Sequence, residues 1–284
     1  RGRTLDKFLA KTHEYILVYA KDINTSCLYE VDKEGEGISD YKHKDKKGKY
    51  RILELRNRNP VFNKSNRPNL FYPFYTDKDF TKISIEKKKD LNVEIIPQNS
   101  KGVDGCWTWS KEKSKKNIEY LMPHKASTGK LTVFRKDYLF KENKIATTKE
   151  KALWMEKNIN NENGKEILTE IFEGKCPFDF PKSVDLIKKC LKISTRPDQN
   201  HIILDSFAGS GTTAHSVLEL NKSDNGNRKF ILIEMEKYAD EITAERVRKL
   251  SKGIKKSKNL NLQNGFDTGF EYYELKDEIK IDSL

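Results

Sequence analysis

Two glycines that follow an acidic strand end make the strongest chemical signal in this chain. The apolar run Ile202–Leu204 ends in Asp205, and Gly209 and Gly211 follow just before a helix-like pattern begins. Such a turn lets backbone come close to a ligand, and the helix start directs free N–H groups toward it. The spacing therefore predicts a ligand-binding turn at the end of a buried strand.

A second acid narrows the class of ligand. The next apolar run, Phe230–Ile233, ends in Glu234, and an acid in that place can accept hydrogen bonds from both hydroxyls of a ribose. The segment 209–214 also fits the G-x-G-x-x-G/A dinucleotide fingerprint, which is weak evidence alone. Asp205 would repel a pyrophosphate and attract the ammonium of a methionine moiety, which favours S-adenosylmethionine over NAD. A Walker-type loop needs a lysine, and none occurs between residues 200 and 221.

Positive charge is in excess and is unevenly distributed. Lys and Arg total 55 against 43 Asp and Glu, which gives a formal net charge of +12. Residues 41–70 hold ten basic residues and two acids, a net charge of +8. This stretch predicts contacts to DNA phosphates, and a solvated charged face is the alternative. The candidate DNA-contacting residues are Lys44, Lys46, Lys47, Lys49, Arg56, Arg58 and Arg67.

Several segments resemble amino-group DNA methyltransferases of the β class, specifically the modification (Mod) subunits of type III restriction systems. Asp205–His215 resembles the cofactor motif of that family, and residues 178–187 resemble the segment that precedes it. Further similar segments are residues 12–21, 67–73, 105–110 and 227–235. The matches spread over residues 11 to about 250, which makes a chance coincidence improbable.

The resemblance implies an enzyme that flips a base out of duplex DNA, so that its exocyclic amine attacks the methyl group of S-adenosylmethionine. It implies adenine N6 as the target, while cytosine N4 stays open on the residues alone. It also implies a homodimer that works with a helicase-nuclease restriction subunit. The residues expected to bind the cofactor are Phe180, Pro181, Lys182, Asp205, Phe207, Ala208, Gly209, Ser210, Gly211, Thr212 and Glu234.

One part of the family pattern is missing. The family performs its chemistry with an Asp-Pro-Pro-Tyr type motif, and no such tetrapeptide occurs here. The nearest match, residues 59–62 (Asn-Pro-Val-Phe), follows basic residues rather than an apolar strand, which favours a plain turn. We therefore assign no catalytic residue and expect an N-terminal part with the motif to be absent. Two alternatives stay open: a non-catalytic DNA-binding or assembly module that keeps the cofactor fold, and, less favoured, a nicotinamide-dependent oxidoreductase.

The pattern of elements predicts an α/β fold in which a Rossmann-like S-adenosylmethionine-dependent methyltransferase sheet holds an inserted α+β target-recognition domain. Residues 1–24 and 171–250 are assigned to the methyltransferase domain, and 25–170 to the recognition domain, which binds DNA. Residues 251–284 are assigned to a C-terminal tail with a closing strand.

Individual elements follow from apolar periodicity. Tyr15–Ala20 is expected to be a strand of the methyltransferase sheet, and residues 265–275 the closing strand. Helices are expected at residues 149–157, 182–193 and 238–250.

The cysteines, the histidines and the hydropathy pattern argue against a metal-binding, a disulfide-rich or a membrane-spanning protein. The four cysteines form no Cys-x-x-Cys pair and the five histidines show no metal-ligand spacing, so neither a metal site nor a disulfide framework is expected. No apolar run approaches the ~20 residues that cross a bilayer, and no signal sequence is recognisable. We therefore expect a cytoplasmic protein without a membrane partner.

Overall fold

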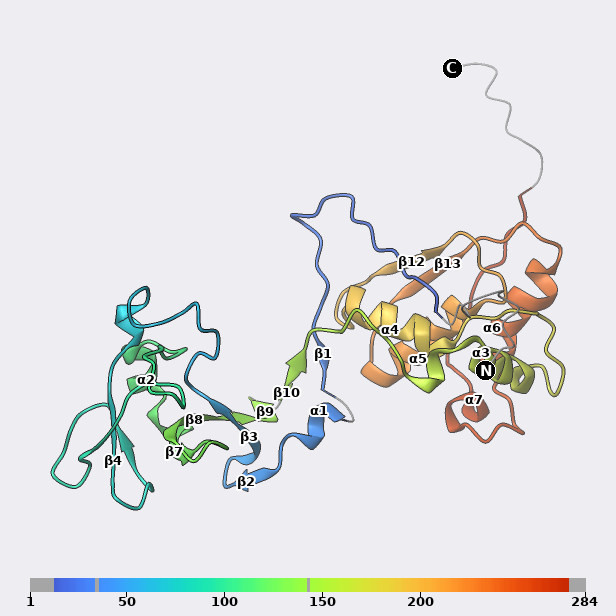
Figure 1. Cartoon of the computed structure of the whole chain (residues 1–284). Coiled ribbons are helices and arrows are strands. Elements are labelled where there is room, and N and C mark those ends of the chain that lie inside the picture. The colour runs from blue at the N-terminus through green and yellow to red at the C-terminus, as the bar shows by residue number, and fades with distance from the viewer. Residues whose placement is uncertain (1–12, 34–35, 142–143, 276–284) are drawn as a thin grey trace, which may run out of the picture. The chain divides into compact units, whose positions relative to one another are not determined.

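The computed structural model describes residues 13–33, 36–141 and 144–275, and the chain divides into two compact units (Figure 1). Unit 1 combines the stretch up to Val31 with the chain from Lys149 onward, and unit 2 is Asp32–Thr148. Unit 2 is therefore shorter at both ends than the predicted 25–170. Both helices and strands occur, which agrees with the predicted α/β class.

Unit 2 consists mainly of antiparallel strands. They are β2 (His43–Asp45), β3 (Gly48–Glu54), β4 (Phe74–Thr76), β5 (Ile83–Ser84), β6 (Val93–Ile95), β7 (Leu121–Lys125), β8 (Leu131–Tyr138), β9 (Phe140–Lys141) and β10 (Lys144–Ile145). One sheet has the order β2-β3-β8-β7, a second has the order β5-β4-β6, and β9 pairs with β10. A further two-stranded pair joins β1 (Val31–Asp32) and β11 (Thr147–Thr148). The helical segments are α1 (Glu36–Ser39), η1 (Pro68–Leu70), α2 (Lys111–Lys116) and η2 (Ile118–Tyr120).

The two larger sheets of unit 2 contribute to one apolar core. Its buried members are Leu55, Tyr72, Phe74, Ile85, Ile95, Trp107, Leu121 and Val133. Trp107 is fully buried, and its indole Nε1 donates a hydrogen bond to the Tyr72 carbonyl oxygen at 2.7 Å. Because the polar atom of the indole is satisfied, the ring adds apolar contact area without an orphaned donor.

Unit 1 contains most of the helical residues that the structure describes, together with a short parallel sheet. Its helical segments are η3 (Lys157–Ile159), α3 (Asn161–Ile171), α4 (Val184–Ser194), α5 (Thr212–Asp224), the π-helical turn η4 (Ala239–Ala244), α6 (Glu245–Lys252) and α7 (Leu260–Asn264). Its strands β12 (Ile202–Asp205) and β13 (Lys229–Leu232) pair in parallel, with Ile203 opposite Phe230. The predicted helices at 182–193 and 238–250 are confirmed as α4 and as η4 with α6.

Helix α5 connects the two parallel strands and is the central packing element of unit 1. Val217 and Leu220 pack with Leu191 of α4, whereas Leu218 packs with Leu250 of α6. Apolar residues therefore face two sides of α5, which explains why it is buried along most of its length. The helix ends at Asn225, whose left-handed φ of 53° closes the last turn.

Three predicted elements do not form. Tyr15–Ala20 has no regular secondary structure and its side chains are exposed, residues 149–156 form no helix, and residues 265–275 form no strand. Periodicity shows that a segment suits a sheet or helix, but a strand also needs a neighbouring edge to satisfy its N–H and C=O groups. Within the described residues, neither Tyr15–Ala20 nor residues 265–275 pairs with a neighbouring strand. Residues 1–12 of the predicted domain lie outside the described residues.

Candidate functional site

The predicted turn lies between β12 and α5, and both of its glycines adopt the left-handed region. Gly209 has a φ of 52° and Gly211 a φ of 74°, values that side chains rarely tolerate. A Cβ at Gly211 would also lie 3.0 Å from the Thr243 carbonyl oxygen of η4. Gly211 is the N-cap residue of α5 and has no side chain to bond the first N–H groups of the helix. The turn thus leads into a helix start, as the sequence predicted, but Gly211, Thr212 and Thr213 are all buried, so this start is covered by the protein itself.

Asp205 stands at the end of β12 and is held by the turn. One carboxylate oxygen accepts a hydrogen bond from the Phe207 N–H at 3.2 Å, and the other accepts one from the Thr213 hydroxyl at 2.5 Å. A carboxylate offers about four acceptor positions, so these two bonds leave acceptor capacity. Asp205 is therefore fixed in orientation and can still bind a donor.

Glu234 follows β13 and reaches back to the same turn. Its Oε2 accepts a hydrogen bond from the Gly209 N–H at 2.8 Å, and its Oε1 accepts from the N–H groups of Met235 and Glu236. The structure thus brings the two predicted acids, which follow the two parallel strands, to the same glycine turn.

The segment before α4 lies against the turn. The Thr212 hydroxyl donates to the Lys182 carbonyl oxygen at 3.3 Å, and the Phe178 ring would be 3.3 Å from a Cβ at Gly209. Pro181 is buried, whereas Phe180 is exposed. The Lys182 ammonium lies 2.7 Å from the Glu14 carboxylate. The predicted cofactor-binding segments are therefore neighbours, and Phe180 and Phe207 border an open surface.

A buried arginine that the sequence analysis missed supports the turn from below. Arg246 of α6 is completely buried, and its Nη1 donates to the Ser210 carbonyl oxygen and to the Thr212 hydroxyl, both at 3.0 Å. Burial lowers the pKa of Arg246 to about 9, which still leaves it charged at neutral pH. The sequence does contain a signal for this burial, because Arg246 lies on the same helix face as the apolar residues Val247 and Leu250.

His215 continues this buried network. Nη2 of Arg246 donates to His215 Nδ1 at 3.0 Å, and His215 Nε2 lies 3.2 Å from a Glu219 carboxylate oxygen. Burial lowers the pKa of His215 to about 4, although Glu219 favours the charged form. Glu219 also pairs with Lys188 at 2.7 Å. His215 is therefore a buried member of the hydrogen-bond network that supports the turn.

The predicted DNA-contacting lysines gather on one β-hairpin of unit 2. Lys44 of β2 stands directly opposite Lys49 of β3, and Lys46 and Lys47 form the connecting turn. Like charges in register destabilise a strand pair slightly. Lys47 pairs with Glu119 at 3.2 Å, whereas no ion pair of Lys44, Lys46 or Lys49 is found within the described residues. This lysine hairpin is an exposed cationic surface.

The three predicted arginines lie outside the hairpin. Arg56 and Arg58 both bond Glu54, at 2.8 Å and 3.1 Å from their Nε atoms. Arg67 stacks its guanidinium over the Phe62 ring with the centroid at 5.3 Å. Residues 59–62 form a turn closed by a bond from the Phe62 N–H to the Asn59 carbonyl oxygen. This geometry agrees with the plain-turn interpretation.

The described residues contain neither a candidate metal site nor a candidate membrane span. No group of three or more His, Cys, Asp and Glu side chains in that part of the chain could hold a metal ion. Among the same residues, no helix is long and apolar enough to cross a membrane.

Unit 1 combines strands and helices, and its glycine turn lies between the carboxyl end of a parallel strand and the start of a helix, the place where nucleotide-binding α/β proteins bind their ligands. Sequence comparison gives the family: the N6/N4-type DNA methylase family matches residues 2–245, and the chain belongs to it. The resemblance inferred from the motifs is thereby confirmed.

Individual relatives carry related names. The type II methyltransferase M.KpnI of Klebsiella pneumoniae is 34% identical over 234 residues, which cover 82% of this chain and 52% of that protein. The Mod subunit of the type III restriction-modification enzyme EcoPI of Escherichia phage P1 is 29% identical over 227 residues, covering 78% of this chain and 34% of that protein. The StyLTI Mod subunit of Salmonella typhimurium is 35% identical over 128 residues, which cover 40% of this chain and 19% of that protein. The chain thus spans about half the length of the first relative and about a third of the second.

Proposed function

We propose that this chain carries the S-adenosylmethionine-binding part and the DNA-recognition domain of a site-specific DNA methyltransferase. The reaction is methyl transfer to the exocyclic amine of a flipped base, adenine at N6. The observation that carries the proposal is the glycine turn that is bonded by two acids, Asp205 and Glu234, in a member of a DNA methylase family.

The residues present fit the cofactor. The two left-handed glycines shape the turn and pack against Phe178 and Thr243. Asp205 is oriented and has acceptor capacity for the methionine ammonium, and Glu234 is placed for the ribose hydroxyls. A ribose would compete for Glu234 with the Gly209 N–H. Lys182 would pair with the methionine carboxylate after its ion pair with Glu14 is broken. Bound at this turn, the cofactor supplies a sulfonium-activated methyl group.

We assign β12 and β13 to the centre of a Rossmann-like sheet. They are parallel, they are joined through a helix, and the side chains of Ile202, Leu204 and Ile231 are exposed on the face away from α5. Parallel strands normally have both faces covered. In a doubly wound sheet that face carries further helices, and the free edges carry further strands.

We assign unit 2 to target recognition. It lies in the sequence between the two stretches of unit 1, it has its own core, and it bears the lysine hairpin. Lys44, Lys46 and Lys49 would contact phosphates and hold the duplex while a base is flipped.

The proposed partners are double-stranded DNA, a second copy of the chain, and the restriction subunit of a type III system. Similarity to proteins named as type III Mod subunits supports the last of these. Similarity to a type II methyltransferase favours an enzyme that works without that subunit, which is the second candidate. A DNA substrate and four cysteines without a disulfide agree with a cytoplasmic location.

Product analysis tests the proposal. The protein is incubated with S-adenosylmethionine labelled in the methyl group and with unmethylated duplex DNA, and the DNA is digested to nucleosides. Label in N6-methyladenine would support the proposal, and label in N4-methylcytosine would change the assigned base. Because the chain contains no Asp-Pro-Pro-Tyr motif, unlabelled DNA together with tight cofactor binding would assign these residues to cofactor and DNA binding alone.

A further inference from the structure

Unit 2 contains a polar groove of about 490 Å³ that lies outside the lysine hairpin. Three separate segments line it: residues 52–58 at the end of β3, residues 98–100, and residues 124–134 around the turn between β7 and β8. Four cations and a single acid are among the lining side chains: Arg56, Arg58, Lys125, Lys130 and Glu54. The groove therefore favours an electron-rich ligand.

One wall is organised by a carboxylate that is almost completely buried. The side chain of Glu54 is only 8% exposed, and it accepts hydrogen bonds from Nε of both Arg56 and Arg58. The side chain of Arg58 is 77% exposed, and no other hydrogen bond of it is found among the described residues. Its Nε is thus fixed by Glu54, while its two Nη groups are left to face solvent as an oriented fork.

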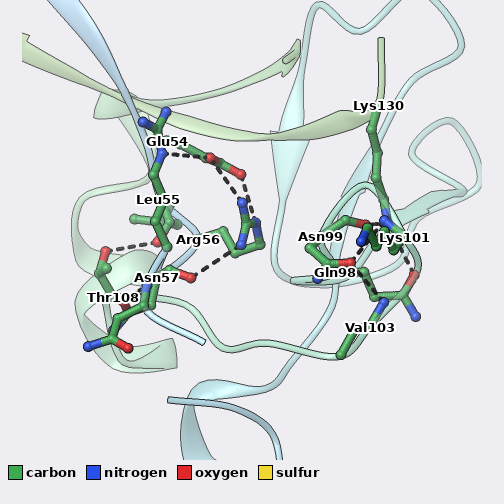
Figure 2. Close-up of polar contacts among 12 residues, drawn as sticks. Glu54, Leu55, Arg56, Asn57, Gln98, Asn99, Lys101, Val103, Thr108 and Lys130 are labelled. Carbon is green, nitrogen blue, oxygen red and sulfur yellow. Dashed lines mark hydrogen bonds and ion pairs between the residues drawn. The ribbon is translucent and has the colours of Figure 1, made fainter. Parts of the chain in front are cut away.

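The opposite wall is organised by Lys130. Its ammonium donates to the Asn99 carbonyl oxygen at 2.8 Å and to the Gln98 side-chain oxygen at 3.3 Å, and Figure 2 shows this cluster across from Glu54 and Arg56. Gln98 is held in turn by Asp104 at 2.9 Å. Burial, together with the charge of Arg56, lowers the pKa of Lys130. The positive charges of Arg56 and Lys130, on opposite walls of the groove, therefore repel each other.

A polar atom on the groove wall has no partner. Thr132 is 3% exposed, it lines the groove, and its hydroxyl oxygen makes no hydrogen bond within the described residues. Leaving a buried hydroxyl unpaired costs free energy that a polar ligand group would recover. The groove thus combines an oriented donor fork with an unused polar group.

We infer that this groove reads a guanine of the recognised DNA sequence, with Arg58 as the specificity-determining residue. The inference rests on the proposed DNA-methyltransferase function. A planar arginine fork that is fixed at Nε matches the O6 and N7 acceptors of guanine in the major groove. A phosphate is the alternative ligand of this fork, and the variants below distinguish it from guanine. Glu54 acts as a positioning residue for Arg58.

Selection from a pool of random duplexes tests this inference on the whole chain. Wild-type protein is compared with Arg58→Lys, which keeps the charge and removes the fork, and with Lys44→Gln on the lysine hairpin. Bound duplexes are sequenced at two salt concentrations. We expect the wild type to enrich a guanine at one position, and Arg58→Lys to lose that preference by roughly 5- to 150-fold. Lys44→Gln should weaken all sequences about equally.

Glu54→Gln supplies a second variant with a distinct readout. It should relax the preference at the same position as Arg58→Lys, because the fork is no longer oriented. A lower unfolding temperature with the sequence preference intact would give Glu54 a purely structural role and contradict the inference. A change of affinity in Arg58→Lys that is equal for all sequences, with the guanine preference intact, would show a phosphate contact instead. Absence of any enriched sequence with wild-type protein would overturn the proposed function itself.

Discussion

The two units differ in how completely they bury their apolar side chains. In unit 2, Leu55 and Val133 on neighbouring strands are 0% exposed and belong to a core that includes both larger sheets. In unit 1, Ile202 and Leu204 on β12 are 64% and 59% exposed. A parallel sheet ordinarily has apolar cover on both faces. The comparison teaches that unit 2 buries its apolar side chains within its own two larger sheets, whereas the strands next to the glycine turn of unit 1 leave the apolar side chains of one face exposed.

The largest effect is expected from the core of unit 2. Trp107→Ala should lower the free energy of unfolding of unit 2 by about 3–5 kcal/mol, because it removes a fully buried ring and its hydrogen bond. Trp109→Phe is the milder control, because Trp109 is only partly buried. Denaturant unfolding measures the loss, and cofactor affinity should not change if the units are independent. A parallel loss of cofactor affinity would break the comparison.

Matched leucines compare the two faces of unit 1. Leu218→Ala, inside the α5 core, should cost about 2–4 kcal/mol of unfolding free energy. Leu204→Ala, on the bare face of β12, should cost less than about 1 kcal/mol because its side chain buries little area. The denaturant midpoints of the two variants measure this difference in unfolding free energy. Equal costs would mean that the bare face is already covered in solution.

The buried network beneath the turn predicts a pH dependence. Burial lowers the pKa of His215 from 6.5 to about 4, so between these values the unfolded chain binds a proton that the folded chain does not. The contribution of His215 to the free energy of unfolding of unit 1 is therefore complete above pH 6.5. It should fall by about 3 kcal/mol as the pH approaches 4. His215→Asn should flatten this part of the curve.

A control separates His215 from the other titrating groups. His43→Gln, at an exposed position of unit 2, should leave the slope of unit 1 unchanged. Burial would raise the pKa of Glu219, but His215 and Lys188 outweigh it and lower that pKa to about 2, so its contribution is lost at more acidic pH. A slope in His215→Asn equal to that of the wild type would refute the assignment.

The smallest effect is expected at the lysine hairpin. Replacing Lys44, Lys46 and Lys49 with Gln should make the salt dependence of DNA binding shallower by roughly 0.9 for each lysine that contacts a phosphate. Removing the same charge from unit 1, at exposed Lys252, Lys255 and Lys256, is the matched control. An equal change in both triple variants would return the hairpin to a solvated charged face.

The sequence predicted the parts of the molecule that are locally encoded. The glycine turn, α4 and the segment that becomes η4 and α6 follow from residue types within a dozen positions. Arg246 was missed because its partners Ser210 and His215 lie more than thirty residues away in the chain. The groove around Arg58 was missed for the same reason, since it joins three distant segments. Tyr15–Ala20 was predicted as a strand because its pattern reports suitability for a sheet and not the presence of a pairing edge.

Calorimetric titration with S-adenosylmethionine, and separately with NAD, tests the central claim most directly. We predict binding of S-adenosylmethionine alone, and a loss of about 1.5–3 kcal/mol in Asp205→Ala and in Glu234→Ala, because each removes a charge-assisted hydrogen bond. Trp107→Ala should retain the wild-type affinity. Binding of NAD, or unchanged affinity in both acid variants, would contradict the assignment of the glycine turn.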